Sequence, residues 1–201
     1  MVKIYGIRQS RAMRCYWTAE ELGLEHEAVP VSFMGDTRKP EYLAINPNGH
    51  IPALVDGDVK LFESLAINLY LAKRYNKHGL YPSSIADEAR AIQWSFWAMT
   101  EVEAPALQIM LHTLVIPKEQ RSAKAVSDAT EKLKGPLGVL DAALAGKKYL
   151  LGDTFTIADL NVASVLGMAA RGGIDLSSTP NVARWLPECL ARPAFSKATA
   201  A

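Results

Sequence analysis

Cysteine is scarce in this chain, with only Cys15 and Cys189 among 201 residues. Two cysteines so far apart match no metal-binding motif, and they cannot form a framework of several disulfides. Intracellular proteins, whose compartment keeps thiols reduced, typically lack such a framework. We therefore expect a cytoplasmic protein without a metal site.

The chain also lacks an excess of charge of either sign and any long hydrophobic run. Lys and Arg number 22 against 21 Asp and Glu, which leaves a formal net charge of +1. So balanced a charge favours neither nucleic acid nor an anionic membrane surface as a partner. No apolar run approaches the roughly 20 residues that span a bilayer, and Met1–Tyr5 enters a strand-like run instead of a signal sequence. We expect no nucleic acid and no membrane among its partners.

The first 77 residues have the pattern of a mixed α/β unit. Apolar strands are predicted at residues 2–5 and 28–31, with a helix between them from about Ala12 to Leu22 that stops at Gly23. Further elements follow in order: a helical turn at residues 40–45, a hairpin of residues 53–56 and 59–62, and a helix at residues 64–75. This order predicts a thioredoxin-like domain over residues 1–77.

Residues 78–84 supply the Gly, Pro and Ser of a linker, and the pattern after them is helical. Apolar residues recur at helix spacing in four segments, which are residues 85–115, 118–145, 157–171 and 182–191. Thr156 is predicted to cap the third of these helices, with Asp159 completing a capping box. We therefore expect an all-α domain over residues 85–201.

The segment of residues 46–67 combines groups suited to hold a small peptide. Pro52 directly follows Ile51, where a cis bond can turn the Ile51 amide and carbonyl toward an extended ligand. Glu63 and Ser64 open a helix whose free amides form an anion site, and Glu63 adds an acceptor for an ammonium group. The sequence predicts a site for the amino acid end of a peptide. Helix capping by Glu63 and Ser64 is the alternative, and it uses the same amides.

Four motifs together resemble the cytosolic glutathione transferases, in particular serine-type, theta-like bacterial members. In chain order they are Ser10–Arg14 followed by Glu20–Leu24, Asn46–Pro52, Glu63–Ser64 with Ala66–Ile67 and Tyr70–Leu71, and Phe155–Leu160. One such motif is a weak signal, whereas their order and spacing along nearly the whole chain are specific. The resemblance implies a thioredoxin-like glutathione-binding domain, an all-helical domain that carries the electrophile site, and a homodimer.

The resemblance also assigns residues to glutathione, the implied cosubstrate. Ile51 is implied to pair its backbone with the cysteinyl part of glutathione, with Pro52 in the cis form. Glu63 and Ser64 are implied to hold the γ-glutamyl end, and His50 to reach the glycine carboxylate. For His50 the alternative is an exposed loop histidine.

Ser10 is the residue predicted to activate the thiol. It follows the first strand and precedes the first helix, so its hydroxyl and the helix N-terminus can both face a bound sulfur. Lowering a thiol pKa of about 8.5 by about two units costs about 2.7 kcal/mol, which one hydroxyl hydrogen bond plus a helix dipole can supply. The alternatives are a plain capping role for Ser10 and activation by Tyr5, at the end of the first strand. Cys15 is expected to be a small core residue.

A further set of side chains is expected at the second-substrate pocket or the dimer face. These are Tyr5, Arg11, Trp97, Glu101, Gln108 and His112. Arg11 can add positive potential near the sulfur. The last four fall on one helix face, which can line a pocket, form a dimer interface or simply pack.

The predicted function is glutathione transfer in a detoxification role, in which the glutathione thiolate attacks an electrophilic, mostly apolar second substrate. The alternatives are glutathione-dependent isomerisation, reductive dehalogenation, ether cleavage or peroxide reduction on the same fold. A non-catalytic interaction module is a third class. The chain has no Cys-x-x-Cys pair, which excludes the usual dithiol redox site.

Overall fold

The structure is a computed structural model that describes residues 1–200, and the chain divides into two compact units. One unit comprises Met1–Tyr81 together with Ala191–Ala201, and the other comprises Pro82–Leu190. The boundary at residues 81 and 82 falls inside the segment expected to be a linker, residues 78–84.

The first unit is built on a four-stranded sheet with the strand order β2-β1-β3-β4. The strands are β1 Val2–Tyr5, β2 His26–Val29, β3 Ala53–Asp56 and β4 Val59–Phe62. β1 pairs in parallel with β2 and antiparallel with β3, and β3 and β4 form the predicted hairpin. The second strand begins at His26 instead of residue 28, because polar side chains are tolerated on an edge strand, where Glu27 pairs with Lys3 at 2.9 Å.

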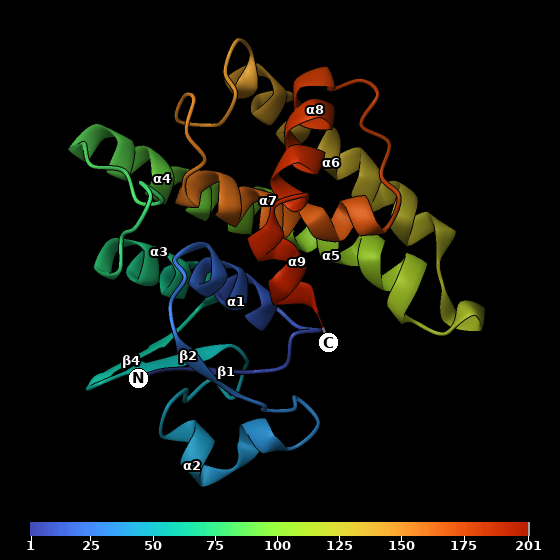
Figure 1. Cartoon of the computed structure of the whole chain (residues 1–201). Helices are drawn as coiled ribbons and strands as arrows, with labels where there is room; N and C mark the ends of the chain where they lie inside the picture. Colours follow the sequence, from blue (N-terminus) through green and yellow to red (C-terminus); the bar gives the residue numbers. More distant parts are fainter. Residues whose placement is uncertain (201) are drawn as a thin grey trace. The chain divides into compact units, whose positions relative to one another are not determined.

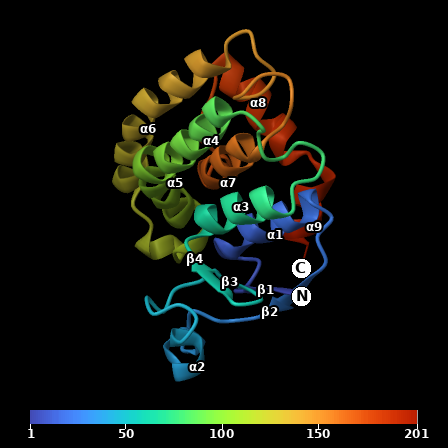
Figure 2. The same ribbon diagram turned by 90° about the vertical axis from the view of Figure 1, so that its left-hand side faces the viewer.

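Helices cover both faces of this sheet. The helices of the unit are α1 Ala12–Glu21, α2 Pro40–Leu43, α3 Ser64–Arg74 and α9 Pro193–Thr199, with a 3-10 turn at Asp36–Arg38. Figures 1 and 2 show α1 and α3 on one face of the sheet and α2 on the other. Because side chains alternate along a strand, Ile4 points to one face and Tyr5 to the other, where Tyr5 packs with Tyr42 and Ile51.

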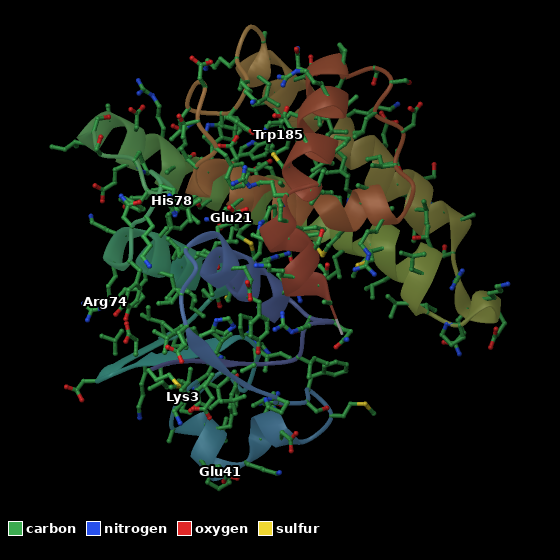
Figure 3. All side chains as sticks on the ribbon, viewed as in Figure 1. Lys3, Glu21, Glu41, Arg74, His78 and Trp185 are labelled. Atoms are coloured by element: carbon green, nitrogen blue, oxygen red, sulfur yellow. The ribbon has the colours of Figure 1, made fainter. Side chains whose placement is uncertain are left out.

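The C-terminal helix α9 belongs to the first unit, although a helical domain of residues 85–201 was expected. It packs on α1, where the rings of Trp17 and Phe195 meet edge to face with centroids 4.8 Å apart. Arg192 donates two hydrogen bonds to the carboxylate of Glu21, at 2.6 and 2.7 Å (Figure 3 labels Glu21). A helical pattern records which residues face inward but not which helix they face, so the sequence could not place α9.

The second unit is all helical, as predicted. Its helices are α4 Ile85–Trp97, α5 Glu103–Met110, α6 Ala123–Leu144, α7 Ile157–Arg171 and α8 Pro180–Leu190, with π-helical segments at Ala98–Val102 and Leu111–Val115 and a 3-10 turn at Lys118–Gln120. Helix α7 is buried along most of its length and packs against α4, α5 and α8 (Figure 1). Among residues 1–200, no helix has the length and apolar character needed to cross a membrane.

Asp159 ties several parts of the second unit together at the start of α7. Its carboxylate accepts hydrogen bonds from the Thr156 amide and hydroxyl, both at 3.0 Å, which confirms the predicted capping box. It also accepts from the Leu150 amide at 2.8 Å and from Trp185 Nε1 at 3.0 Å. Burial raises the pKa of Asp159, and these four hydrogen bonds oppose the rise. The carboxylate is therefore a structural hub.

Candidate active site

Three segments of the first unit converge around Gly6, which follows β1. Gly6 has a φ of 137°, and a Cβ placed on it would lie 2.7 Å from the Cβ of Ala12 and 3.3 Å from the Cβ of Ile51. Only glycine fits this backbone and this space. The end of β1, the start of α1 and the Ile51-Pro52 segment therefore lie side by side.

Ser10 lies in the turn that connects β1 to α1, as predicted. Its amide and its hydroxyl both donate to the carbonyl of Ile7, at 3.1 and 2.6 Å. Its Oγ accepts from the amide of Ala12, the first residue of α1, at 3.1 Å. The hydroxyl is half-buried at the start of the helix. To donate to another acceptor, it must exchange its bond to the Ile7 carbonyl.

Tyr5, the alternative activator, lies on the α2 face of the sheet. Its ring centroid is 6.2 Å from that of Tyr42, and it packs in the apolar cluster that includes Val31 and Ile51. Helix α1, which follows Ser10, covers the opposite face of the sheet (Figure 2). The packing of Tyr5 fits the alternative in which strand alternation makes it a core residue.

The loop before Pro52 is held by two side chains that the sequence analysis did not assign. The hydroxyl of Tyr42 and the side-chain amide of Asn46 both donate to the carbonyl of His50, at 2.6 Å each. Burial raises the pKa of Tyr42 to about 12, so its hydroxyl keeps its proton and remains a donor. The Ile51-Pro52 peptide bond is cis, as predicted. The ring of His50 is exposed.

The start of α3 joins the same site through α1. Glu63 is exposed, has a φ of 70°, and makes no capping hydrogen bond, so the capping alternative is not observed for it. Ser64 is buried, and its hydroxyl accepts from Nη1 of the buried Arg14 at 3.3 Å. Cys15 lies beside them, with its Sγ 3.7 Å from the Ser64 carbonyl. Burial raises the pKa of the Cys15 thiol, as expected of a core cysteine.

Arg38 is a further cationic group at this site that the sequence analysis missed. A Cβ placed on Gly49 would lie 2.7 Å from Arg38 Nη1, so the guanidinium lies against the backbone immediately before His50. Arg38 ends the 3-10 turn before α2 and is exposed. No sequence motif marks it, and the only local signal is a basic residue in the loop before a helix.

The remaining predicted residues are spread over several environments. Arg11 is exposed at the N-cap position of α1. Trp97 packs edge to face on Trp94, with ring centroids 4.9 Å apart. Glu101 is exposed, and Gln108 lines a cavity of about 400 Å³ beside α6. His112 accepts a hydrogen bond at Nδ1 from the amide of Ser122, at 3.3 Å, and so supports the start of α6.

Comparison with known proteins identifies the family. Residues 1–73 match the family described as glutathione S-transferase, N-terminal domain, and residues 103–193 match glutathione S-transferase, C-terminal domain. Glutathione S-transferase 3 of Zea mays is 38% identical over 210 residues, which cover 100% of this chain and 94% of that protein. The chain belongs to the glutathione S-transferase family. The prediction of a glutathione transferase is thereby confirmed, as is its fold, a thioredoxin-like domain with an all-helical domain.

Two further relatives agree with this membership. Glutathione S-transferase F9 of Arabidopsis thaliana is 32% identical over 212 residues, with 100% of this chain and 97% of that protein covered. The theta class glutathione S-transferase of Xanthomonas axonopodis pv. citri, solved with glutathione bound, superposes with a TM-score of 0.90 at 29% identity, covering 100% of this chain and 97% of that one. Similarity therefore extends along the whole chain.

Proposed function

We propose that this glutathione transferase binds reduced glutathione in the first unit and uses Ser10 to stabilise its thiolate. The observation that carries the proposal is the convergence at Gly6, where the start of α1 meets Ile51 in space that admits no side chain. Arg14 extends the same site to Ser64 at the start of α3. A hydroxyl, a strand-like backbone edge and a helix N-terminus are thus assembled in one unit.

Each part of glutathione has a chemically matched partner. The Ile51 backbone pairs with the cysteinyl residue, as an extended peptide pairs with a strand. The γ-glutamyl carboxylate binds at the start of α3 with Ser64, where helix amides favour an anion. The exposed carboxylate of Glu63 accepts from the γ-glutamyl ammonium. Arg38 and His50 bind the glycine carboxylate at the other end.

The reaction begins with loss of the glutathione thiol proton to solvent. The Ser10 hydroxyl keeps its bond from the Ala12 amide and turns its proton from the Ile7 carbonyl to the sulfur. A hydrogen bond to a charged acceptor is worth about 1.5–3 kcal/mol, and the bond to Ile7 that is given up is worth about 1 kcal/mol. The net gain of about 0.5–2 kcal/mol lowers the thiol pKa by about 0.4–1.5 units, to which the start of α1 adds.

The thiolate then attacks the electrophilic carbon of a mostly apolar second substrate. The new bond is formed between sulfur and carbon with the electron pair of the thiolate, and a leaving group departs with the pair of the broken bond. We assign the second substrate to the helical unit, and we propose that the enzyme works in the cytoplasm as a homodimer. Size-exclusion chromatography with light scattering tests the dimer, since a monomer mass would contradict it.

Calorimetric titration with reduced glutathione, alongside the ultraviolet signal of the bound thiolate as a function of pH, tests the proposed function. We expect binding with a thiolate pKa below that of free glutathione. Absence of binding at millimolar glutathione would contradict the proposal and favour a non-catalytic interaction module.

Replacing Arg38 with alanine is expected to weaken glutathione binding about five- to tenfold, because an exposed charge-assisted contact to the glycine carboxylate is worth about 1 kcal/mol. The measurement is the Kd for reduced glutathione by calorimetry. Lys39→Ala is the matched control, since Lys39 carries the same charge on the next residue and pairs with Asp36 at 2.7 Å. Equal losses in both variants would show a general charge effect and remove Arg38 from the site.

Replacing Tyr42 with phenylalanine is expected to raise the Kd for glutathione about three- to fivefold, because the His50 carbonyl loses one of its two fixed donors. Tyr70→Phe is the control, because its hydroxyl donates at 2.8 Å to Asp56, in the β3–β4 hairpin. Both variants lose one hydroxyl hydrogen bond, so a change in Kd confined to Tyr42→Phe ties the effect to the loop. An unchanged Kd in Tyr42→Phe would count against this role.

A further inference from the structure

Arg8 links the turn that carries Ser10 to the C-terminal helix. Its Nη1 donates to the carbonyls of Lys197 and Ala198, at 3.3 and 2.9 Å. These carbonyls belong to the last turn of α9, Pro193–Thr199, where a helix leaves carbonyl groups without partners and carries partial negative charge. The guanidinium also lies over the ring of Tyr16, 4.5 Å from its centroid. Arg8 is therefore held from two sides.

The position of Arg8 in the chain connects this hold to the Ser10 hydroxyl. Arg8 follows Ile7, whose carbonyl accepts hydrogen bonds from both the amide and the hydroxyl of Ser10. The hydroxyl of Tyr16 donates to the carbonyl of Gly6 at 2.9 Å, which fixes the chain just before the turn. Tyr16 thus supports one end of the connection, and Arg8 supports the turn itself.

We propose that Arg8 is a positioning residue for Ser10, through which α9 fixes the place of the activating hydroxyl. The inference rests on the proposed function, in which Ser10 donates to the thiolate. The guanidinium is a planar group whose several donors suit neighbouring carbonyls and whose face suits an aromatic ring. Without it, the turn keeps the hydrogen bonds of Ser10, but one of these must be exchanged when the hydroxyl turns to sulfur. The Oγ then occupies a wider range of positions, and its bond to the thiolate weakens.

The test compares the pKa of the bound glutathione thiolate, read from ultraviolet absorbance against pH, in Arg8→Ala and Arg192→Ala. Both variants remove a contact between α9 or its N-cap and the rest of the unit, but Arg192 donates to Glu21, the last residue of α1, at the opposite end of that helix from Ser10. We expect Arg8→Ala to raise the thiolate pKa by about half a unit, with a roughly threefold loss of kcat/KM at pH values below the pKa. We expect Arg192→Ala to lower the Tm and leave the thiolate pKa unchanged.

A double variant separates this inference from the proposed function. If Arg8 acts through Ser10, Arg8→Ala adds nothing to the thiolate pKa of Ser10→Ala, because the group it positions is gone. An unchanged pKa in Arg8→Ala, the same shift in Arg192→Ala, or full additivity would overturn the role of Arg8 alone. An unchanged pKa in Ser10→Ala would instead overturn Ser10 as activator, and the role of Arg8 with it. If Arg8→Ala does not fold, Arg8→Lys, which lacks the planar guanidinium, is compared in the same way.

Discussion

Ser10→Ala is expected to lower kcat/KM for conjugation by up to about 30-fold near pH 6.5 and to raise the pKa of the bound thiolate by about 0.4–1.5 units. The variant removes the hydroxyl that accepts from the Ala12 amide at the start of α1 and leaves the helix itself in place. The helix dipole therefore remains, which keeps the loss below the full effect of an unperturbed thiol.

The loss of activity in Ser10→Ala depends on pH. A lowered thiol pKa provides thiolate, and hence activity, at pH values above that pKa, and activity falls as the pH drops through it. Ser10→Ala moves this acidic limb to higher pH. The loss is largest at and below pH 6.5 and fades above about pH 9, where both enzymes hold thiolate and the less acidic thiol is the better nucleophile.

Tyr5→Phe is the comparison that decides between the two hydroxyl groups. Because Tyr5 packs with Tyr42 on the α2 face of the sheet, we expect loss of the Tyr5 hydroxyl to leave the acidic limb of the pH–rate profile unshifted. A profile shifted by Tyr5→Phe and not by Ser10→Ala would assign activation to Tyr5. The measurement is the rate with one electrophile and saturating glutathione from about pH 5.5 to 9.5. This range brackets the thiol pKa and is sufficient to decide between the two hydroxyl groups.

Asp159→Ala is expected to cost about 3–5 kcal/mol of the free energy of unfolding, because it removes the acceptor of four buried donors at once. Donors from Leu150, Thr156 and Trp185 are left buried without this partner. Burial of the Asp159 carboxylate costs desolvation energy, which raises its pKa. Removing the carboxylate also removes this cost, which offsets part of the loss of stability. Urea unfolding followed by tryptophan fluorescence measures the change.

Asp153→Ala is the matched control for this substitution. Asp153 is exposed in the same connection before α7, so its removal is expected to change stability by less than about 0.5 kcal/mol. Equal urea midpoints for Asp159→Ala and the parent protein would contradict the stabilising role described for Asp159 in the second unit. A loss in Asp153→Ala as large as that in Asp159→Ala would attribute the effect to acidic charge instead of buried hydrogen bonds.

Local patterns were sufficient for most of the elements. The hairpin of residues 53–56 and 59–62 and the helix at Ile157–Arg171 were predicted with the bounds that the structure shows. Their signals are short-range, because a Gly-Asp turn and a capping box act between residues a few positions apart. The second strand was predicted two residues too late, and α9 was not predicted as a separate helix. An edge strand and a short helix depend for their positions on partners that are distant in sequence.

The residues of the candidate site also fall into those that a local motif predicted and those that only the folded structure revealed. Ser10, Ile51 with cis Pro52, and Glu63 with Ser64 were predicted as site residues because each is part of a motif with its own sequence signature, and the cis bond is observed. The residues that lie beside them carry no such signature. Tyr42 donates to the His50 carbonyl, Arg8 donates to the carbonyls of α9, and Arg38 lies against Gly49. Such contacts depend on the folded backbone.

By itself the sequence determined the family and the two kinds of domain, and it predicted the motifs that we propose bind glutathione, because turn residues, helix caps and hydrophobic periodicity are patterns among neighbouring residues. Only the tertiary structure decided that α9 joins the first unit, that Gly6 lies against both Ala12 and Ile51, and that the Ser10 hydroxyl already has a partner in the Ile7 carbonyl. The place of α9 and the contact between Gly6 and Ile51 arise from close packing between segments far apart in the chain, which local pattern does not record. The bond from Ser10 to Ile7, three residues away, depends on the folded path of the turn.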